Sequence, residues 1–213
     1  MSEYSRKVVE NKLAVGPGGN TSMRDGDVMW ISPSGFALDD VSDESWVPVN
    51  IESGENLHEM LQPSSEVRMH LEIYRQREDV EAIVHTHPPV TIGMISSGLE
   101  EVPMMFPDYV AIVGDTVPLI DYVIPCSDEL AFAVIGVLKD PSYQALCLRN
   151  HGLITVGTNM KQAYYRTEII EDGARVYWIS SAFGQPRVLT YDEKQAILNL
   201  EAEKYRQKLL DRS

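Results

Sequence analysis

Two histidines stand two residues apart at the end of an apolar run, in the segment "EAIVHTHPPV" (residues 81–90). Residues i and i+2 of a β-strand point to the same face, so His85 and His87 would present two imidazoles side by side. Such a pair is half of the ligand set of a tetrahedral metal site. The same spacing fits two polar residues that hydrogen-bond to neighbours at a strand terminus, and the pair alone leaves both interpretations open.

A third ligand would be needed, and His151 is the first candidate. It lies in "RNHGLI", where a glycine follows it in a tight bend between apolar segments, and binding sites are commonly built at such bends. His58 and His70 compete for the role. We expect His70 to be a half-buried helix residue bonded to a neighbour, and His58 to be solvated.

Three turns of small residues could bind an anion. They are "GGNTS" with Gly19 and Asn20, "SPSG" with Ser34 and Gly35, and "PSSE" with Ser64 and Ser65. Each offers backbone N–H groups with little side-chain bulk, and a helix starting at the serines would add its positive end. Each is an ordinary turn when taken singly, so a phosphate site depends on the three converging.

Glu66 follows the two serines directly. A carboxylate there would lie close to the carbon that adjoins a bound phosphate, where it could move a proton. The alternative is a plain acidic residue in the first turn of a helix, which is very common.

Alternating strands and helices must position these residues. Helices are predicted over 63–76 (capped by Ser64 or Ser65), 127–140 (capped by Ser127), 159–180 and the charged tail 192–210, with weak helix in 1–14. Strands are predicted at 28–32, 80–87 and, bent at 150–152, within 144–157. The pattern predicts one α/β domain over residues 1–213.

The composition limits the class of protein. With 18 basic against 32 acidic residues the net charge is −14, which argues against a nucleic-acid-binding surface. No apolar stretch is long enough for a membrane span, and the N-terminus lacks a secretion signal, so we expect a cytoplasmic protein. Cys126 and Cys147 are expected to be reduced, half-buried thiols.

Five motifs in register resemble the class II aldolase/adducin-head family, which includes L-fuculose-1-phosphate aldolase and L-ribulose-5-phosphate 4-epimerase. They run through residues 15–180: Gly19-Asn20-Thr21-Ser22, Ser32-Pro33-Ser34-Gly35, Ser64-Ser65-Glu66, His85-Thr86-His87-Pro88 and Asn150-His151-Gly152-Leu153.

The resemblance implies a three-layer α/β/α sandwich with a largely antiparallel central sheet, assembled as a homotetramer with active sites near subunit contacts. It implies a divalent metal, Zn²⁺ or else Mn²⁺ or Co²⁺, on His85, His87 and His151. It implies that Glu66 is the acid/base group. A phosphorylated sugar substrate would bind through its phosphate to a set of small residues, Gly19, Asn20, Ser34, Gly35, Ser64 and Ser65.

Within the family, Ser32 and Glu66 favour an aldolase that cleaves a ketose 1-phosphate to dihydroxyacetone phosphate and an aldehyde, because the epimerase has Lys and Asp at these positions. Asp108-Tyr109 resembles an epimerase segment, and Tyr109 or Tyr191 could serve the far oxygen in an aldolase. The alternatives are the epimerase, a methylthioribulose-1-phosphate dehydratase, and an adducin-like assembly module without enzymatic activity.

Overall fold

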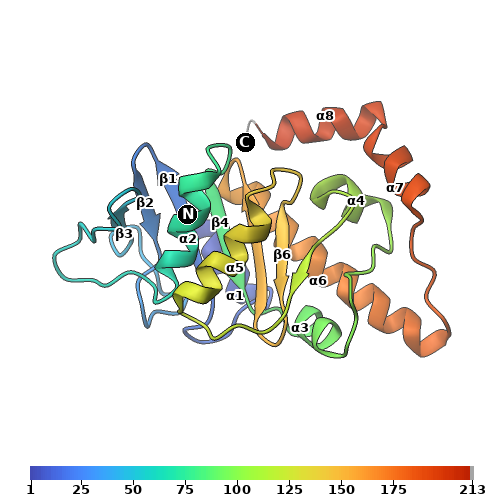
Figure 1. Ribbon diagram of the computed structural model, residues 1–213, viewed down its shortest axis with the longest axis horizontal. Coiled ribbons are helices and arrows are strands. Elements are labelled where there is room, and N and C mark those ends of the chain that lie inside the picture. Colours follow the sequence, from blue (N-terminus) through green and yellow to red (C-terminus); the bar gives the residue numbers. More distant parts are fainter. Residues whose placement is uncertain (212–213) are drawn as a thin grey trace.

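A seven-stranded sheet forms the centre of the computed structural model, which describes residues 1–211 (Figure 1). The strand order is β3-β2-β1-β4-β7-β6-β5, and every neighbouring pair is antiparallel except β5 and β6. The strands are β1 (Asn20–Asp25), β2 (Val28–Ile31), β3 (Val47–Asn50), β4 (Ala82–Thr86), β5 (Leu119–Ile120), β6 (Ala145–Leu148) and β7 (Gly152–Gly157).

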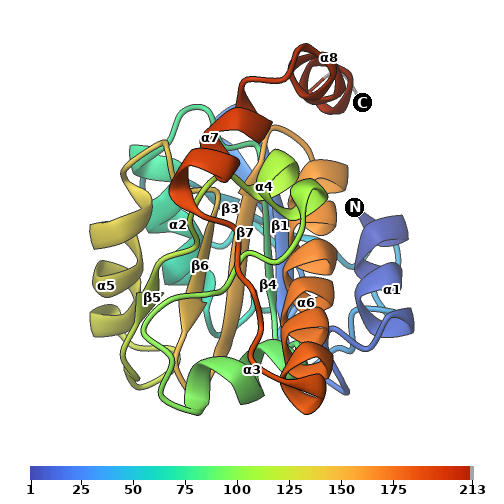
Figure 2. The same ribbon diagram turned by 90° about the vertical axis from the view of Figure 1, so that its right-hand side faces the viewer.

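Helices cover both faces of this sheet (Figure 2). On one face lie α2 and α5, and on the other lie α1 and α6, with α3 and α4 packed against α6. The helices are α1 (Ser2–Glu10), α2 (Val67–Gln76), α3 (Pro89–Ser96), α4 (Pro107–Val113), α5 (Asp128–Leu138), α6 (Met160–Phe183), α7 (Tyr191–Leu198) and α8 (Glu201–Leu210). The prediction of a three-layer α/β/α fold with a largely antiparallel sheet is confirmed.

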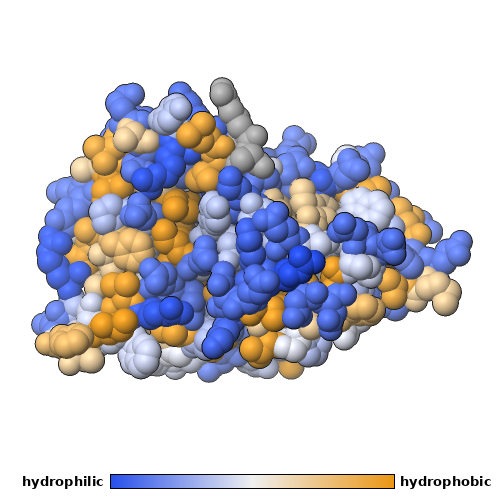
Figure 3. All heavy atoms as spheres, turned by 180° about the vertical axis from the view of Figure 1, so that it is seen from behind, coloured by the Kyte–Doolittle hydropathy of each residue, from blue (hydrophilic) through white to orange (hydrophobic). Residues whose placement is uncertain are grey.

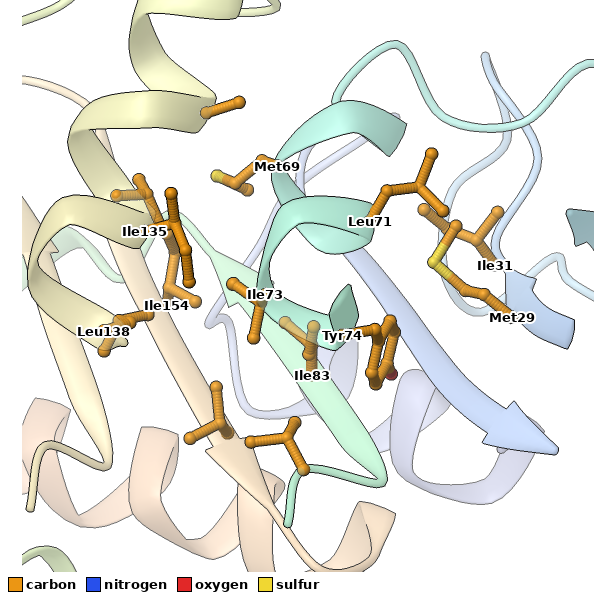
Figure 4. Close-up of a cluster of buried hydrophobic side chains, with 14 of the residues drawn as sticks. Met29, Ile31, Met69, Leu71, Ile73, Tyr74, Ile83, Ile135, Leu138 and Ile154 are labelled. Carbon is orange, nitrogen blue, oxygen red and sulfur yellow. The ribbon is translucent and has the colours of Figure 1, made fainter. Parts of the chain in front are cut away.

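The central strand β4 is buried on both faces, and its alternation decides which side chains meet which helices. Ile83 packs with the apolar residues of α2 and α5 (Figure 4), whereas Ala82 and Val84 pack in a cluster with residues of α1 and α6. Burying one isoleucine side chain stabilises the fold by roughly 1.5–3 kcal/mol. A one-residue slip of β4 would reverse both faces, so packing fixes the register.

Several elements differ from the sequence prediction. Helix α2 begins at Val67, with Glu66 at its N-cap and no side-chain cap, so neither predicted serine caps it. Two short helices that the sequence did not suggest, α3 and α4, each begin at a proline, which is well suited to the first helical turn. The tail is two helices rather than one, because Leu200 between α7 and α8 is extended.

The C-terminal part projects beyond the sheet. The last turns of α6 extend past the other elements, and α7 and α8 return along the same end of the molecule (Figure 1). Seen from behind, the surface is mostly hydrophilic, with hydrophobic residues in scattered patches (Figure 3). Among the described residues, no helix combines the length and the apolar character that crossing a membrane requires.

Candidate metal and substrate site

Three imidazoles meet at one end of the sheet. His85, His87 and His151 each offer a ring nitrogen, and these atoms lie within 4.8 Å of one another. The ring centroids are 4.9 Å (85–87), 4.9 Å (85–151) and 5.4 Å (87–151) apart. The structure therefore brings together the three histidines that the sequence singled out.

Strand β4 and the segment after it aim two of these rings. His85 shares the face of Ile83, which is the face that α2 covers, and His87 follows two residues later. Pro88 then precedes α3, whose first N–H groups are held by a buried carboxylate of α6: Glu171 accepts hydrogen bonds from Val90 and Thr91 at 3.0 and 2.8 Å. The end of β4 is thereby tied to α6.

A three-residue hairpin carries the third ring. His151 N–H donates to Leu148 O at 3.1 Å, and Asn150 has φ 55°, the left-handed conformation that asparagine tolerates better than most residues. The Arg149 side chain donates to the carbonyl oxygens of Ile95 at 2.6 Å and Leu99 at 3.3 Å, which fastens the hairpin to α3.

Glu66 faces the same point from the N-cap of α2. Its Oε2 lies 3.0 Å from His85 Nε2, and its Oε1 lies 3.3 Å from His151 Nε2. Burial alone would raise the pKa of this carboxyl, but the nearby charges of His85 and His151 outweigh it and hold the pKa well below its usual range. The carboxylate is therefore ionised at neutral pH.

The donor set fits a divalent cation. His85 Nδ1 lies 3.1 Å from Leu153 O, which only accepts, so this nitrogen carries a proton and Nε2 is the ring nitrogen that would bind a cation. Nε2 faces His87 Nε2 at 3.2 Å and the Glu66 carboxylate at 3.0 Å. Several electron-rich atoms directed at one point need positive charge between them, and imidazole nitrogens with a carboxylate oxygen suit zinc and similar ions.

A cavity of 280 Å³ opens beside the histidines. The three small-residue turns converge on it, as an anion site requires. Gly19 (φ 74°) lies so close to β4 that a Cβ there would come within 2.8 Å of His85 O, so only glycine fits. The lining contains all six residues predicted to hold the phosphate, together with Glu66, two of the three histidines and five neighbouring residues. The full lining is Pro17, Gly18, Gly19, Asn20, Pro33, Ser34, Gly35, Ser64, Ser65, Glu66, His87, Pro125, Cys126 and His151.

A chain of buried polar groups lies behind Glu66, and the sequence did not suggest it. Asn20 Nδ2 donates to Glu66 Oε2 at 3.0 Å, and Asn20 Oδ1 lies 2.6 Å from His70 Nε2. Ser22 Oγ lies 2.6 Å from His70 Nδ1 and 2.9 Å from the Tyr74 hydroxyl. The amide nitrogen of Asn20 is thus engaged by Glu66, which the phosphate prediction for this residue did not anticipate.

His70 differs from its expectation, because it is fully buried rather than half-buried. Burial, with a smaller contribution from the charge of His85, lowers the pKa of His70 to about 3, so its imidazole is neutral. His58 is also bonded rather than freely solvated: its Nδ1 accepts from the N–H groups of Met60 and Leu61 at 3.0 and 2.9 Å. Neither ring belongs to the histidine cluster.

The two cysteines are not the half-buried pair that the sequence suggested. Cys147 is fully buried in the core, which raises the pKa of its thiol to about 12, whereas Cys126 is exposed at the cavity. Cys126 has φ 60° and its Sγ–H donates to Ser65 Oγ at 3.2 Å. No motif marked this residue, because its place depends on how the segment before α5 folds against the serines.

The further candidates for proton transfer lie outside this cavity. Asp108 is exposed and forms an ion pair with Arg206 at 2.7 Å. Tyr109 is fully buried in the core beside α6, and Tyr191 is exposed at the start of α7.

Comparison with known proteins agrees with this geometry. The family model described as class II aldolase and adducin N-terminal domain matches residues 1–178. The 5-deoxy-D-ribulose 1-phosphate aldolase of Bacillus thuringiensis is 35% identical over 194 residues, which are 90% of this chain and 89% of the relative. The L-fuculose phosphate aldolase of Escherichia coli is 30% identical over 205 residues, covering 92% and 93% of the two chains.

Solved structures agree as well. An L-fuculose 1-phosphate aldolase superposes with a TM-score of 0.83 at 29% identity and covers 96% of this chain and 93% of its own. The protein belongs to the class II aldolase and adducin N-terminal domain family.

Proposed function

We propose that this protein is a metal-dependent aldolase that reversibly cleaves a ketose 1-phosphate to dihydroxyacetone phosphate and an aldehyde. The observation that carries the proposal is the meeting of His85, His87, His151 and Glu66 beside a cavity lined by small residues. The relatives named above act on fuculose and 5-deoxyribulose phosphates, which supports a substrate of this class.

The three histidines would hold the cation, with Zn²⁺ as the first choice and Mn²⁺ or Co²⁺ as alternatives. When bound, a divalent ion would supply positive charge for the oxyanion that forms when the carbon–carbon bond next to a carbonyl breaks. The hydrogen bond from His85 Nδ1–H to Leu153 O fixes the tautomer that presents Nε2 to the ion.

The phosphate would lie among the three converging turns. Ser34, Ser64 and Ser65 supply hydroxyl groups there, and Gly19 and Gly35 leave the backbone open. The start of α2, directly after the serines, adds the partial positive charge of a helix N-terminus. This hollow gives a dianion local donors although the whole chain has a net charge of −14. Anchoring the phosphate would hold the scissile bond next to the histidines.

Glu66 would carry the proton. In cleavage Glu66, after taking up a proton, would pass it to the carbon of the dihydroxyacetone phosphate fragment as the bond to the aldehyde carbon breaks, and the hydroxyl group on the aldehyde carbon would lose its own proton to the group that serves the aldehyde oxygen. In synthesis it would remove a proton from the same carbon, whose electron pair then attacks the aldehyde. Its Oε1 has no hydrogen-bond partner and lies 3.3 Å from His151 Nε2, so no hydrogen bond would have to break before this oxygen takes the proton.

We also propose a homotetramer, which the family resemblance supports. Tyr109 and Tyr191 do not line the cavity of their own chain, so a group that serves the aldehyde oxygen would come from elsewhere. The oligomeric state is measured by size-exclusion chromatography with light scattering.

Product analysis tests the activity directly. The protein is stripped with a chelator, reloaded with Zn²⁺, Co²⁺ or Mn²⁺, and incubated with dihydroxyacetone phosphate and a panel of aldehydes, and the products are identified by NMR. We expect ketose 1-phosphates from the metal-loaded protein and none from the stripped one. The chain length of the accepted aldehyde then identifies the substrate.

The alternatives give different results. Epimerisation of ribulose 5-phosphate or loss of water from methylthioribulose 1-phosphate, without new carbon–carbon bonds, would assign the chain to a sister activity. No turnover and no stoichiometric metal would favour an adducin-like assembly role. Activity that is unchanged after complete metal removal would contradict the mechanism.

A further inference from the structure

The buried polar groups behind Glu66 form a chain in which every donor can be assigned. The amide nitrogen of Asn20 donates to Glu66 Oε2, so the amide oxygen is the atom that faces His70. Amide oxygen only accepts, so His70 Nε2 must carry the proton. This assignment follows from the hydrogen-bonding capacity of the partners alone.

The remaining donors follow in the same way. His70 is neutral and carries its proton on Nε2, so Nδ1 has a lone pair and accepts from the Ser22 hydroxyl. Since the Ser22 proton is used, its oxygen accepts from the Tyr74 hydroxyl. The donors therefore run in one direction, from Tyr74 through Ser22, His70 and Asn20 to Glu66.

Matching spacings of a helix and a strand build this chain. Glu66, His70 and Tyr74 are four residues apart, so they follow one face of α2, while Asn20 and Ser22 are two apart on one face of β1. Four residues of an α-helix rise about 6 Å, and two residues of a strand rise about 6.6 Å, so the two rows stay in step. Asn20, Ser22, His70 and Tyr74 are all less than 5% exposed, at 4%, 0%, 0% and 1%.

We propose that His70, Ser22 and Tyr74 are positioning residues that fix the Asn20 amide and thereby divide the work of the two Glu66 oxygens. Oε2 is held by Asn20 and lies against His85, at 3.0 Å from each, whereas Oε1 has no hydrogen-bond partner. The hydrogen-bond chain holds Oε2 and leaves Oε1 without a hydrogen bond, 3.3 Å from His151 Nε2, as the oxygen that would take the proton. This row of hydrogen bonds orients Glu66 but does not transfer protons, because the Asn20 amide cannot pass a proton from His70 to Glu66. This inference rests on the proposed function, since it assumes that Glu66 transfers a proton.

The first test reads the His70 tautomer without any assay of activity. In zinc-loaded, ¹⁵N-labelled protein, long-range ¹H–¹⁵N spectra distinguish a protonated from an unprotonated ring nitrogen. We expect the neutral Nε2–H form of His70, and its resonances are assigned by their loss in His70→Gln. A proton on Nδ1, or an imidazolium at neutral pH, would overturn the proposal.

The second test separates positioning from binding. Ser22→Ala, Tyr74→Phe and His70→Leu each interrupt the row of hydrogen bonds behind Glu66. Changes of this kind, in groups that orient the reacting residues, typically cost about 10–100-fold in activity. We expect that loss in kcat, with KM for the phosphorylated substrate and the metal content unchanged. His70→Gln, whose amide nitrogen can donate to Asn20, is expected to recover part of the kcat lost in His70→Leu.

Two control variants remove a serine and a tyrosine hydroxyl group that do not belong to this row of hydrogen bonds. Ser5→Ala deletes a buried hydroxyl bonded to Thr21, next to Ser22 but outside the chain, and Tyr164→Phe deletes a tyrosine hydroxyl bonded to Glu168. Both should keep wild-type kcat. An equal loss in these controls, or wild-type kcat in Ser22→Ala and Tyr74→Phe, would refute the positioning role. If wild-type protein cleaves no ketose phosphate, the proposed function fails instead, and the tautomer measurement still decides the hydrogen-bond order.

Discussion

At the scale of single residues, the two oxygens of Glu66 have different surroundings. One is hydrogen-bonded to Asn20 and faces His85, and the other is buried without a hydrogen bond beside His151. A carboxylate held in this way keeps its orientation before the substrate arrives, which lowers the cost of reaching the productive geometry.

Replacing the carboxylate tests its role in proton transfer. Glu66→Gln keeps the size of the side chain but removes the base, so we expect kcat to fall by about 10²–10⁴-fold while zinc content stays stoichiometric. Steady-state kinetics and metal analysis of the same preparation measure both. Glu78→Gln, at an exposed carboxylate beyond α2, is the control and should match the wild type. Full activity in Glu66→Gln would remove this residue from the mechanism.

Thiol labelling tests the cavity mouth. Cys126 is exposed and donates to Ser65, whereas Cys147 is fully buried. Iodoacetamide should therefore modify Cys126 alone in the folded protein, and dihydroxyacetone phosphate should slow the reaction because its phosphate would occupy the adjacent hollow. Mass spectrometry of peptides reports both rates. Modification of Cys126 at one rate with and without the ligand would place the phosphate elsewhere.

At the scale of elements, β7 must pass very close to the end of β4. A Cβ on Gly152, the first residue of β7, would collide with the carbonyl oxygen of Thr86 and lie 2.9 Å from His87 Cδ2. The strand can start there only without a side chain, and the positions of two metal-binding candidates depend on it.

Gly152→Ala should therefore displace β7 or the His87 ring. We expect a loss of roughly 1–3 kcal/mol in the free energy of unfolding and weaker zinc binding. Gly136→Ala, inside α5 with nothing within 4 Å of its added Cβ, should be neutral or stabilise the helix by about 0.5–1 kcal/mol. Chemical denaturation and zinc titration measure the two quantities. Equal stability of both variants would contradict the packing argument.

Local chemistry explains which elements the sequence could predict. Ser127 was predicted as a cap and accepts the expected hydrogen bond from Leu130 N–H, and the helix predicted to begin at Asn159 does so, with Asn159 as its N-cap. Helices α3 and α4 were not predicted: Pro88-Pro89 was interpreted only as the end of a strand, although a proline such as Pro89 or Pro107 also suits a first helical turn. The short parallel strand β5 pairs with β6 across a long connection, which no local pattern records.

Some residues of the candidate site could likewise be predicted from local patterns, and others could not. His85 and His87 share a strand face, so their proximity could be derived from period-two alternation. His151 and the three turns were candidates from their residue types alone, but their convergence was expected only from the family resemblance, because these segments are distant in the sequence. The roles of Asn20 and Cys126 could not be predicted, because each depends on a contact between segments that are distant in the sequence. Asn20 on β1 bonds to Glu66 at the start of α2, and Cys126 before α5 bonds to Ser65.

At the scale of the whole molecule, a metal ion bound by the three histidines would link two segments distant in the sequence, the end of β4 and the β6–β7 hairpin, and would lie beside Glu66 at the N-terminus of α2. Since such a site exists only in the folded chain, binding energy becomes folding energy. At a free zinc concentration 100 times Kd, the stabilisation is about 2.7 kcal/mol, or roughly 5–10 °C in Tm for a protein of this size.

Thermal unfolding measures this link. We expect zinc to raise the Tm of the stripped wild-type protein and of His58→Ala, whose ring lies outside the cluster, but not of His85→Ala. The same zinc-dependent shift in His85→Ala would mean that the ion binds elsewhere.

The matched rows of β1 and α2 also constrain how homologous sequences can change length. One inserted or deleted residue between Glu66 and Tyr74 would rotate the helix by about 100°, and one between Asn20 and Ser22 would turn a side chain to the opposite face of the sheet. Insertions and deletions are therefore expected to be tolerated in connecting segments such as 52–60, which is largely exposed. Along these two short stretches, evolution can exchange side chains but cannot change the number of residues.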